Sequence, residues 1–574
     1  MNAPLIFTPE QLEVAAATTA DPEAIVRAAA ERFSTDPGAI YEEEVIDALR
    51  TIRRKSEATY TRLISPLKGQ RTRLDKLTKT EGDRARAPDV VAIARLAATF
   101  AHTENNEGVA LIERGTHREV HLVQSQSFRC WLSGQVYQAT QQGIPEMAMT
   151  TTLATLTAIG TYDGERVALH TRCAQLEGAY YIDLCNDTWQ VLRIDASGFE
   201  VLDRPPVHFI RTAGMRTLPV PQGTGDINLL WRHVNIPESA RLLVLTWLID
   251  SLRPDTPYPV LELSGEMGSS KSTTQSRLRA LIDPHEVPLR SRPKSVEDIH
   301  VAAANAHVVS FENLSSLSAE QQDTFCILST GGGYATRQLY TNGAEHVTRS
   351  KCPVLLNGIN PVASQPDLIE RVIGVELPTI TAGARRDEQS LERAWQDDYP
   401  HIFTGLVCLF SEALALLPAI QIPDGMQKRM LDFQRLGEAV CMALGGIAGD
   451  FSRQLDKQHD EGVLRGLDSY GIAAAVQVLI ANRTEVSSLK RTRGQHATDA
   501  KARPMWSGTY LQLLHDLNSM PEIDRSNWPR SARHLSVQLT RIAPGLRKLG
   551  IRVERGEHTR KGTMVDILAN DVGM

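Results

Sequence analysis

The stretch that decides the fold is YPVLELSGEMGSSKSTTQSRLRALID, residues 258–283. It begins with a short run rich in apolar and β-forming residues (260–263), continues through a loop with two glycines, and ends in a segment with Leu278, Leu281 and Ile282 on one helical face. A strand, a glycine-bearing loop and a helix, with Lys271 and Ser272 where the helix begins, form the arrangement that wraps the phosphates of a nucleotide. The pattern therefore predicts a nucleotide-binding α/β core.

The loop residues predict a specific set of contacts. Backbone N–H groups would cradle the phosphates, the Lys271 amine would reach the β/γ oxygens, and the Ser272 hydroxyl would ligate Mg²⁺. Ser270 stands where the consensus G-x-x-x-x-G-K-[ST] has its second glycine, so further ATPase elements are needed to support the assignment. ATP and Mg²⁺ are the expected cofactors. The predicted ATP-binding residues are Gly265, Glu266, Met267, Gly268, Ser269, Ser270, Lys271, Ser272 and Thr273.

Bulk composition limits the function classes. The 574 residues predict three to four domains, and a net charge of −6 gives no overall basicity, so any DNA contact must come from local patches. Seven scattered cysteines without a C-x-x-C pair favour reduced thiols in a cytoplasm. The first residues lack an export-type leader. Residues 402–420 are apolar but contain Glu412, so we expect a buried helix and no membrane span.

A second and a third element follow the loop. The strand-like run at 306–311 ends in Glu312-Asn313, and an acidic residue at the end of a buried strand is where an ATPase holds its Mg²⁺-bound water. Glu312 is therefore the second predicted Mg²⁺ ligand besides Ser272, although a chance acid after an apolar strand is the alternative. Asn313 cannot accept a proton. Another buried run, 353–356, ends in Asn357, whose amide could orient the attacking water, although Asn-Gly is often only a turn.

A fourth element is Arg371, which precedes a further strand. An arginine at this place could reach the γ-phosphate of the neighbouring subunit and stabilise charge in the transition state. The alternative is a surface salt bridge with Asp367 or Glu370. The predicted catalytic set is Lys271, Glu312, Asn313, Asn357 and Arg371.

The ordered motifs GEMGSSKST, VVSFENLS, STGGGYATRQLY, PVLLNGIN and PDLIERV resemble the core of AAA+ ATPases. Within that group they are similar to superfamily 3 and minichromosome-maintenance-like replicative helicases of phages, plasmids and integrated elements, over residues 227–440. The resemblance implies ATP hydrolysis between subunits of a homo-oligomeric ring, expected to be a hexamer, with Arg371 as the arginine finger. Such relatives often carry G-E-x-G-x-x-K-S-T, which accommodates Ser270.

A hairpin is predicted around Asn342-Gly343, between residues 331–340 and 345–349. The same resemblance implies that such a hairpin enters a central pore and contacts single-stranded DNA. Arg337, His346 and Arg349 are the candidate contacts, and a purely structural hairpin is the alternative.

The C-terminal part predicts a second DNA-binding module. A helix is expected from Trp506, two more helices broken near Pro544 follow, and two strands then bracket a basic tip at 555–562. Helices followed by a basic hairpin resemble a winged helix-turn-helix that holds duplex DNA, and subunit packing is the alternative use. The predicted contacts are Arg533, Arg541, Arg555, Arg560 and Lys561.

The expected fold is multi-domain: an α/β AAA+ core with a helical lid, a mixed α/β N-terminal region and a C-terminal winged helix. The predicted boundaries are a helical region at 1–90, a mixed α/β domain at 91–222, the core at 227–385, helices at 390–482, a basic linker at 483–503 and the winged helix at 504–574. The predicted function is an ATP-dependent DNA helicase or translocase in the replication of a mobile element. Alternatives are a DNA-associated ATPase switch that does not unwind, acting as a mobile-element regulator or a defence ATPase, and a nucleotide-binding scaffold without turnover.

Overall fold

The computed structural model describes residues 21–67, 69–78, 89–337, 345–381, 386–468, 470–491, 505–520, 525 and 528–569. Contacts divide the chain into two units, one of residues 1–101 and 123–164 and the other of residues 102–122 and 165–574.

The first unit is helical in its described part. Its first helices pack around a core that contains Leu49, Tyr60 and Leu74. The helices of the unit are α2 (Pro22–Arg32), α3 (Glu43–Lys55), α4 (Glu57–Ile64), α5 (Arg71–Thr78), α6 (Val90–Ala97), α7 (Gln126–Thr140) and α8 (Glu146–Asp163). Strand β1 (Thr99–His102) lies where the chain passes from one unit to the other.

The second unit begins with small sheets. Strands β2 (Gly108–Arg114) and β3 (His117–Leu122) form an antiparallel hairpin, and β4 (Leu169–His170) pairs in parallel with β9 (His208–Phe209). Four short strands then form an antiparallel meander. They are β5 (Cys173–Leu176), β6 (Ala179–Asp183), β7 (Val191–Asp195) and β8 (Gly198–Leu202).

A four-stranded parallel sheet carries the predicted nucleotide loop. Its order is β11-β14-β10-β15, so the strand before the loop, β10 (Val260–Ser264), is internal. The other strands are β11 (Val309–Leu314), β14 (Val354–Gly358) and β15 (Val372–Glu376). An isolated parallel bridge between Arg290 and Phe311 extends the edge next to β11. Because all strands are parallel, the residues that follow β10, β11 and β14 meet at one edge of the sheet.

Helices cover both faces of this sheet, as a parallel sheet requires. Leu261, Leu263 and Leu355 belong to a core that also includes residues of four helices: α9 (Glu238–Asp250), α10 (Lys271–Ala280), α14 (Glu388–Leu416) and α15 (Leu431–Ala443). Val260 and Val354 belong to a second core with residues of α11 (Val296–Asn305) and α12 (Ala319–Thr330). The strand residues alternate between the two cores because successive side chains point to opposite faces.

A helical block follows the sheet. It consists of α14 (Glu388–Leu416), α15 (Leu431–Ala443), α16 (Asp450–Asp468) and α17 (Gly471–Arg491). Within the described residues, the stretch Glu388–Ala419 is the one helix long and apolar enough to cross a membrane by length and composition. Its side chains Ile402, Phe403 and Phe410 are fully buried in the core shared with the sheet, which is the environment expected of a core helix. Residues 483–491, predicted as linker, are the end of α17, and residues 492–503 lie outside the described part.

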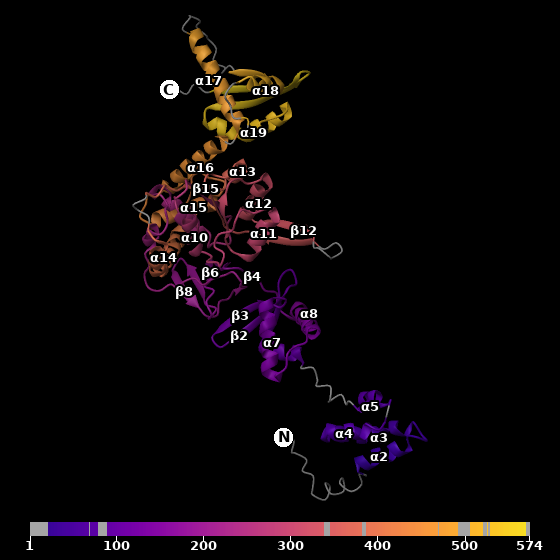
Figure 1. The fold of residues 1–574 in the computed structure, drawn as a ribbon. Coiled ribbons are helices and arrows are strands. Elements are labelled where there is room, and N and C mark those ends of the chain that lie inside the picture. Colours follow the sequence, from indigo (N-terminus) through magenta and orange to yellow (C-terminus); the bar gives the residue numbers. More distant parts are fainter. Residues whose placement is uncertain are drawn as a thin grey trace. The chain divides into compact units, whose positions relative to one another are not determined.

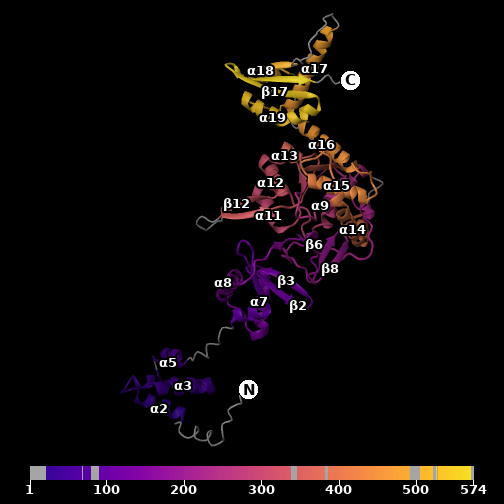
Figure 2. The same ribbon diagram turned by 180° about the vertical axis from the view of Figure 1, so that it is seen from behind.

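A β-hairpin projects from the body of the second unit beside α11 and α12 (Figures 1 and 2). Its strands are β12 (Gly332–Arg337) and β13 (Glu345–Ser350), paired antiparallel from Gly332↔Ser350 to Arg337↔Glu345. The two predicted runs therefore do pair as a hairpin. The predicted Asn342-Gly343 turn lies outside the described residues.

The C-terminal segment forms its own core together with α17 and Leu467 of α16. Its sheet has the order β16-β18-β17, formed by β16 (Trp506–Thr509), β17 (Ile551–Thr559) and β18 (Gly562–Ala569). The helices are α18 (Tyr510–Asn518) and α19 (Ala532–Lys548).

Two expectations for this segment were wrong. Residues 506–509 form a strand because they pair antiparallel with β18, and the capping box between Thr509 and Gln512 starts the helix only at Tyr510. Pro544 does not separate two helices but lies inside the single helix α19, on its exposed side. A proline removes one helical N–H, and the packing of Leu539, Ile542 and Leu546 in the core holds the helix together across that position.

Candidate functional site

The phosphate loop follows β10 and ends at α10, as predicted. Three of its residues have positive φ: Gly265 (149°), Gly268 (85°) and Ser270 (55°). Ser270 therefore adopts the left-handed conformation that the consensus glycine would adopt without a steric penalty. Because an L-residue can occupy this region at a modest cost, the serine preserves the shape of the loop.

Lys271 lies across the loop. Its amine donates to the backbone carbonyl oxygens of Gly265 (2.8 Å) and Glu266 (2.7 Å). Partial burial lowers the pKa of this amine. The loop thus holds the charged amine of Lys271 through two of its own backbone carbonyl oxygens.

Ser272 and Glu312 meet, although 40 residues separate them along the chain. The Ser272 hydroxyl donates to Glu312 Oε2 at 2.9 Å, and Glu312 is half-buried near the end of β11. Among the described residues, no cluster of three or more His, Cys, Asp or Glu side chains could hold a metal by itself. One hydroxyl and one carboxylate are the protein ligands expected of a Mg²⁺ ion that arrives on a nucleotide, since Mg²⁺ takes its other ligands from water and phosphates.

Asn313 lies at an irregularity in β11, where the register with β14 shifts between Phe311 and Leu314. Its φ is 54°, a left-handed conformation that asparagine tolerates better than most residues. Its backbone N–H donates to Asn357 Oδ1 at 2.8 Å, and the residue is exposed at the carboxyl edge of the sheet. The bulge turns the chain immediately after Glu312.

Asn357 is fully buried near the end of β14. Its amide oxygen accepts from Asn313, and its amide nitrogen donates to Gln275 Oε1. Both ends of the amide are therefore engaged inside the protein, and Asn357 links β14 to the loop after Glu312 and to the helix after the phosphate loop.

Gln275 and Asn235 are two site residues that sequence reasoning missed. The fully buried Gln275 donates through Nε2 to Ser310 Oγ (2.8 Å) and to the carbonyl oxygens of Phe311 (3.0 Å) and Leu355 (3.1 Å). A polar residue one helical turn after Lys271, on the face that carries Leu278, is the signal that could have found it.

Asn235 lies between η2 (Ile227–Arg232) and α9. Its side chain donates to the carbonyl oxygens of Ser269 (3.0 Å) and Pro378 (2.6 Å), and its backbone N–H donates to Thr274 Oγ1 (3.0 Å). It thereby joins the phosphate loop to the chain after β15. No local pattern marks it in the sequence.

Arg371 lies at the opposite edge of the sheet from the loop. In the parallel register, Val372 pairs with Val260 and Glu376 pairs with Ser264, so Arg371 stands before the start of β15 while Lys271 follows the end of β10. At roughly 3.3 Å per residue, four strand residues separate the two edges by about 13 Å. Arg371 is 7% exposed and pairs with Asp367 (2.7 Å). The salt bridge with Asp367, one of the two predicted alternatives to a catalytic role, is therefore present, but the arginine side chain in it is largely buried.

The predicted DNA contacts fall in two regions. Arg337, His346 and Arg349 belong to the paired backbones of β12 and β13, and their side chains lie outside the described part. On α19, Arg533 and Arg541 are exposed and eight residues apart, so they share a helical face with the exposed Val537 between them. Three further basic residues are exposed on β17 and in the turn to β18: Arg555, Arg560 and Lys561.

Several solved structures resemble the chain at low identity. The structure titled "SCCmec type IV Cch - active helicase" has 12% identity and a TM-score of 0.42, and the match covers 82% of this chain and 93% of that one. The apo structure of the NrS-1 C terminal region (305-718) has 11% identity and a TM-score of 0.37, with 84% and 100% covered. These TM-scores are too low to transfer the role of any residue.

Two family models match the sequence, whereas no curated protein does. Residues 227–460 match the model described as actinomycete integrative conjugative element replication protein, and residues 473–570 match the C-terminal domain of the same replication protein. The first match contains the parallel sheet, the phosphate loop, Glu312 and the Arg371–Asp367 pair. The second match contains α18, α19 and the three-stranded sheet. Since the two matches together cover more than half of the chain in the order of the family, this chain belongs to the replication proteins of actinomycete integrative conjugative elements.

Proposed function

We propose that this replication protein is an ATP-dependent DNA helicase or translocase, hydrolysing ATP between the subunits of a ring in the cytoplasm. The observation that carries the proposal is the Ser272–Glu312 hydrogen bond, which joins a phosphate-loop helix to the acidic end of a neighbouring parallel strand. Nucleoside triphosphate hydrolysis needs groups in these two places, because Ser272 would lie beside the phosphates and Glu312 beside the attacking water.

The loop would bind the triphosphate of ATP. The Lys271 amine would exchange its two backbone carbonyl partners for phosphate oxygens, and the N–H groups at the start of α10 would add the favourable end of the helix dipole. Mg²⁺, when bound, would neutralise charge on the β- and γ-phosphates. Ser272 and Glu312 would hold it, since their oxygens are already within hydrogen-bond distance of each other.

Glu312 would also orient the attacking water, because Asn313 has no group that accepts a proton. Asn357 would act in part through its second amide hydrogen and in part by fixing the bulge after Glu312. Arg371 belongs to the amino edge of the sheet, and an arginine at that edge is too far from the loop of its own chain. Such an arginine would instead reach the γ-phosphate bound by a neighbouring subunit. A ring, expected to be a hexamer, brings two such edges together.

The C-terminal segment would hold duplex DNA as a winged helix. The order α17, β16, α18, α19, β17, β18, with a β16-β18-β17 sheet, supports this reading, because α19 would then enter the major groove and the β17–β18 turn would be the wing. Arg533, Arg541, Arg560 and Lys561 would contact DNA from these two elements. The β12–β13 hairpin would contact the single strand in the pore through Arg337, His346 and Arg349.

ATPase and strand-displacement assays on the same preparations test the proposal. We expect ATP hydrolysis stimulated by DNA and displacement of a strand from a forked duplex, both abolished in Lys271→Ala and retained in Lys294→Ala, an exposed lysine outside the loop. A Lys271→Ala protein that unwinds as well as the wild type would refute the proposal. Hydrolysis without displacement would favour the alternative of a DNA-associated switch, and ATP binding without phosphate release would favour a scaffold.

A further inference from the structure

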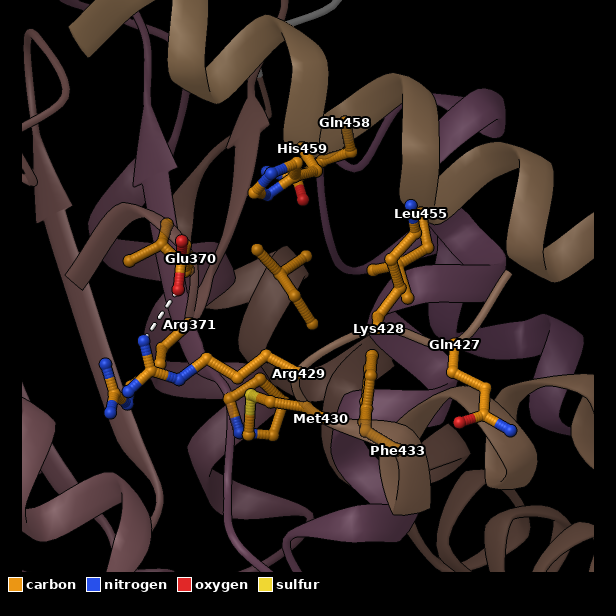
Figure 3. Close-up of a pocket in the computed structure, with 13 residues that line it drawn as sticks. Glu370, Arg371, Gln427, Lys428, Arg429, Met430, Phe433, Leu455, Gln458 and His459 are labelled. Carbon is orange, nitrogen blue, oxygen red and sulfur yellow. Dashed lines mark hydrogen bonds and ion pairs between the residues drawn. The ribbon is translucent and has the colours of Figure 1, made fainter. Parts of the chain in front are cut away.

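Two arginines share one carboxylate at the amino edge of the sheet. Arg371 Nη1 donates to the carboxylate and the backbone carbonyl of Asp367, at 2.7 and 2.5 Å. Arg429, in the segment before α15, donates to the other Asp367 oxygen at 2.8 Å and to Glu370 Oε2 at 2.6 Å. Figure 3 shows both guanidinium groups beside Glu370, at the rim of a cavity of about 210 Å³.

The two arginines differ in how far they can reach. Arg371 is 7% exposed, and its Nε is buried without a hydrogen-bond partner among the described residues. Moving its guanidinium outward would break both of its hydrogen bonds to Asp367 and pull the side chain out of the protein interior that encloses it. The Arg429 side chain is 46% exposed, so its guanidinium already lies at the surface.

The carboxylates fix the direction of Arg429. Its hydrogen bonds to Asp367 and Glu370 restrain a long side chain that would otherwise sample many rotamers, so less conformational entropy would be lost when it binds an anion. Glu370 immediately precedes Arg371, and both lie before β15, at the opposite edge from Lys271. Arg429 is therefore held where it cannot serve the phosphate loop of its own chain.

We propose that Arg429 is the arginine that reaches the γ-phosphate of ATP bound to a second copy of this chain, and that Asp367, Glu370 and Arg371 are positioning residues. The buried Arg371 holds Asp367 through its ion pair, and Asp367 and Glu370 in turn hold the Arg429 guanidinium at the surface. This inference rests on the proposed ATPase function and assigns the trans-acting role to a residue on the segment before α15. A head-to-tail ring supplies the contact, since its two faces are different surfaces of the same subunit.

Complementation between two inactive variants tests this assignment. Arg429→Ala retains an intact phosphate loop but lacks the arginine, whereas Lys271→Ala lacks a working loop but retains the arginine. We expect Arg429→Ala to lower the turnover number for ATP on the order of 10³-fold while ATP binding is unchanged. Mixed in equal amounts, the two variants should recover about a quarter of the wild-type rate per subunit, because about one head-to-tail interface in four then combines both intact parts.

The matched control is Arg453→Ala, which removes a still more exposed arginine that pairs with Asp450 on α16, and this variant should hydrolyse ATP at the wild-type rate. An Arg429→Ala protein as active as the wild type would overturn the proposal, and so would a mixture that stays as inactive as its parts. Either result, with an active wild type, would leave the ATPase function standing. A wild-type protein without ATPase activity would instead refute the proposed function and this inference together.

Discussion

Replacing Ser270 by glycine should stabilise the protein. Ser270 has φ 55° and ψ 35°, and this left-handed conformation costs an L-residue about 1–2 kcal/mol that glycine does not incur. Glycine loses more backbone entropy on folding, which offsets about 0.4–1 kcal/mol of that gain. The Ser270 hydroxyl makes no capping hydrogen bond within the described part of the chain, so no bond is lost. The net expectation is a gain of about 0.5–1 kcal/mol.

The neighbouring serine provides a control with the opposite sign. Ser269 is fully buried, its backbone is outside the left-handed region, and its hydroxyl donates to the Glu266 carbonyl oxygen at 2.9 Å. Ser269→Gly loses this bond and adds backbone freedom to the unfolded chain, so it should destabilise by about 1–2 kcal/mol.

Scanning calorimetry on both variants measures the difference. The unfolding transition of the core should rise by about 1–4 °C in Ser270→Gly, since about 1 kcal/mol shifts a domain of this size by about 2–4 °C. It should fall in Ser269→Gly. A Ser270→Gly protein that melts below the wild type, or two variants that shift in the same direction, would show that left-handed strain is not stored at this position.

Three further predictions concern buried polar groups, each measured by urea unfolding. Gln275→Leu should destabilise by about 2–3 kcal/mol, because it leaves buried acceptors without a donor. Asp283→Ala should destabilise by about 3–5 kcal/mol, because it strips the fully buried Arg172 of its carboxylate, whereas Glu286→Ala at an exposed pair should change stability by less than about 1 kcal/mol. Burial raises the pKa of Asp250 to about 7, from 3.8. The folded state then retains a proton that the unfolded state releases, so stability is lost as the pH rises through 7, and Asp250→Asn should remove this loss.

Local patterns in the sequence predict much of the nucleotide-binding core. The apolar run before Ser264, the glycines and the periodic leucines of α10 predict a strand, a loop and a helix through neighbouring residues alone, and the structure confirms these elements. The order of acid and amide along the chain likewise places Glu312 and Asn357 near the carboxyl ends of parallel strands, which share one edge, whereas Arg371 precedes its strand and lies at the opposite edge. Where local signals conflict, the expectation was wrong. The apolar spacing from Trp506 reads as a helix, yet the Thr509 cap starts the helix later.

The sequence by itself determined the phosphate loop, including the unusual Ser270, because turn geometry depends on residues next to one another. Only the tertiary structure decided which distant groups meet. It brought Gln275 to Asn357, Asn235 to the loop, and Arg429 to the carboxylate that holds Arg371. It also showed that Ser270 lies in the left-handed region that a glycine would occupy. Contacts of this kind depend on the packing of elements far apart along the chain, and no local spacing encodes that packing.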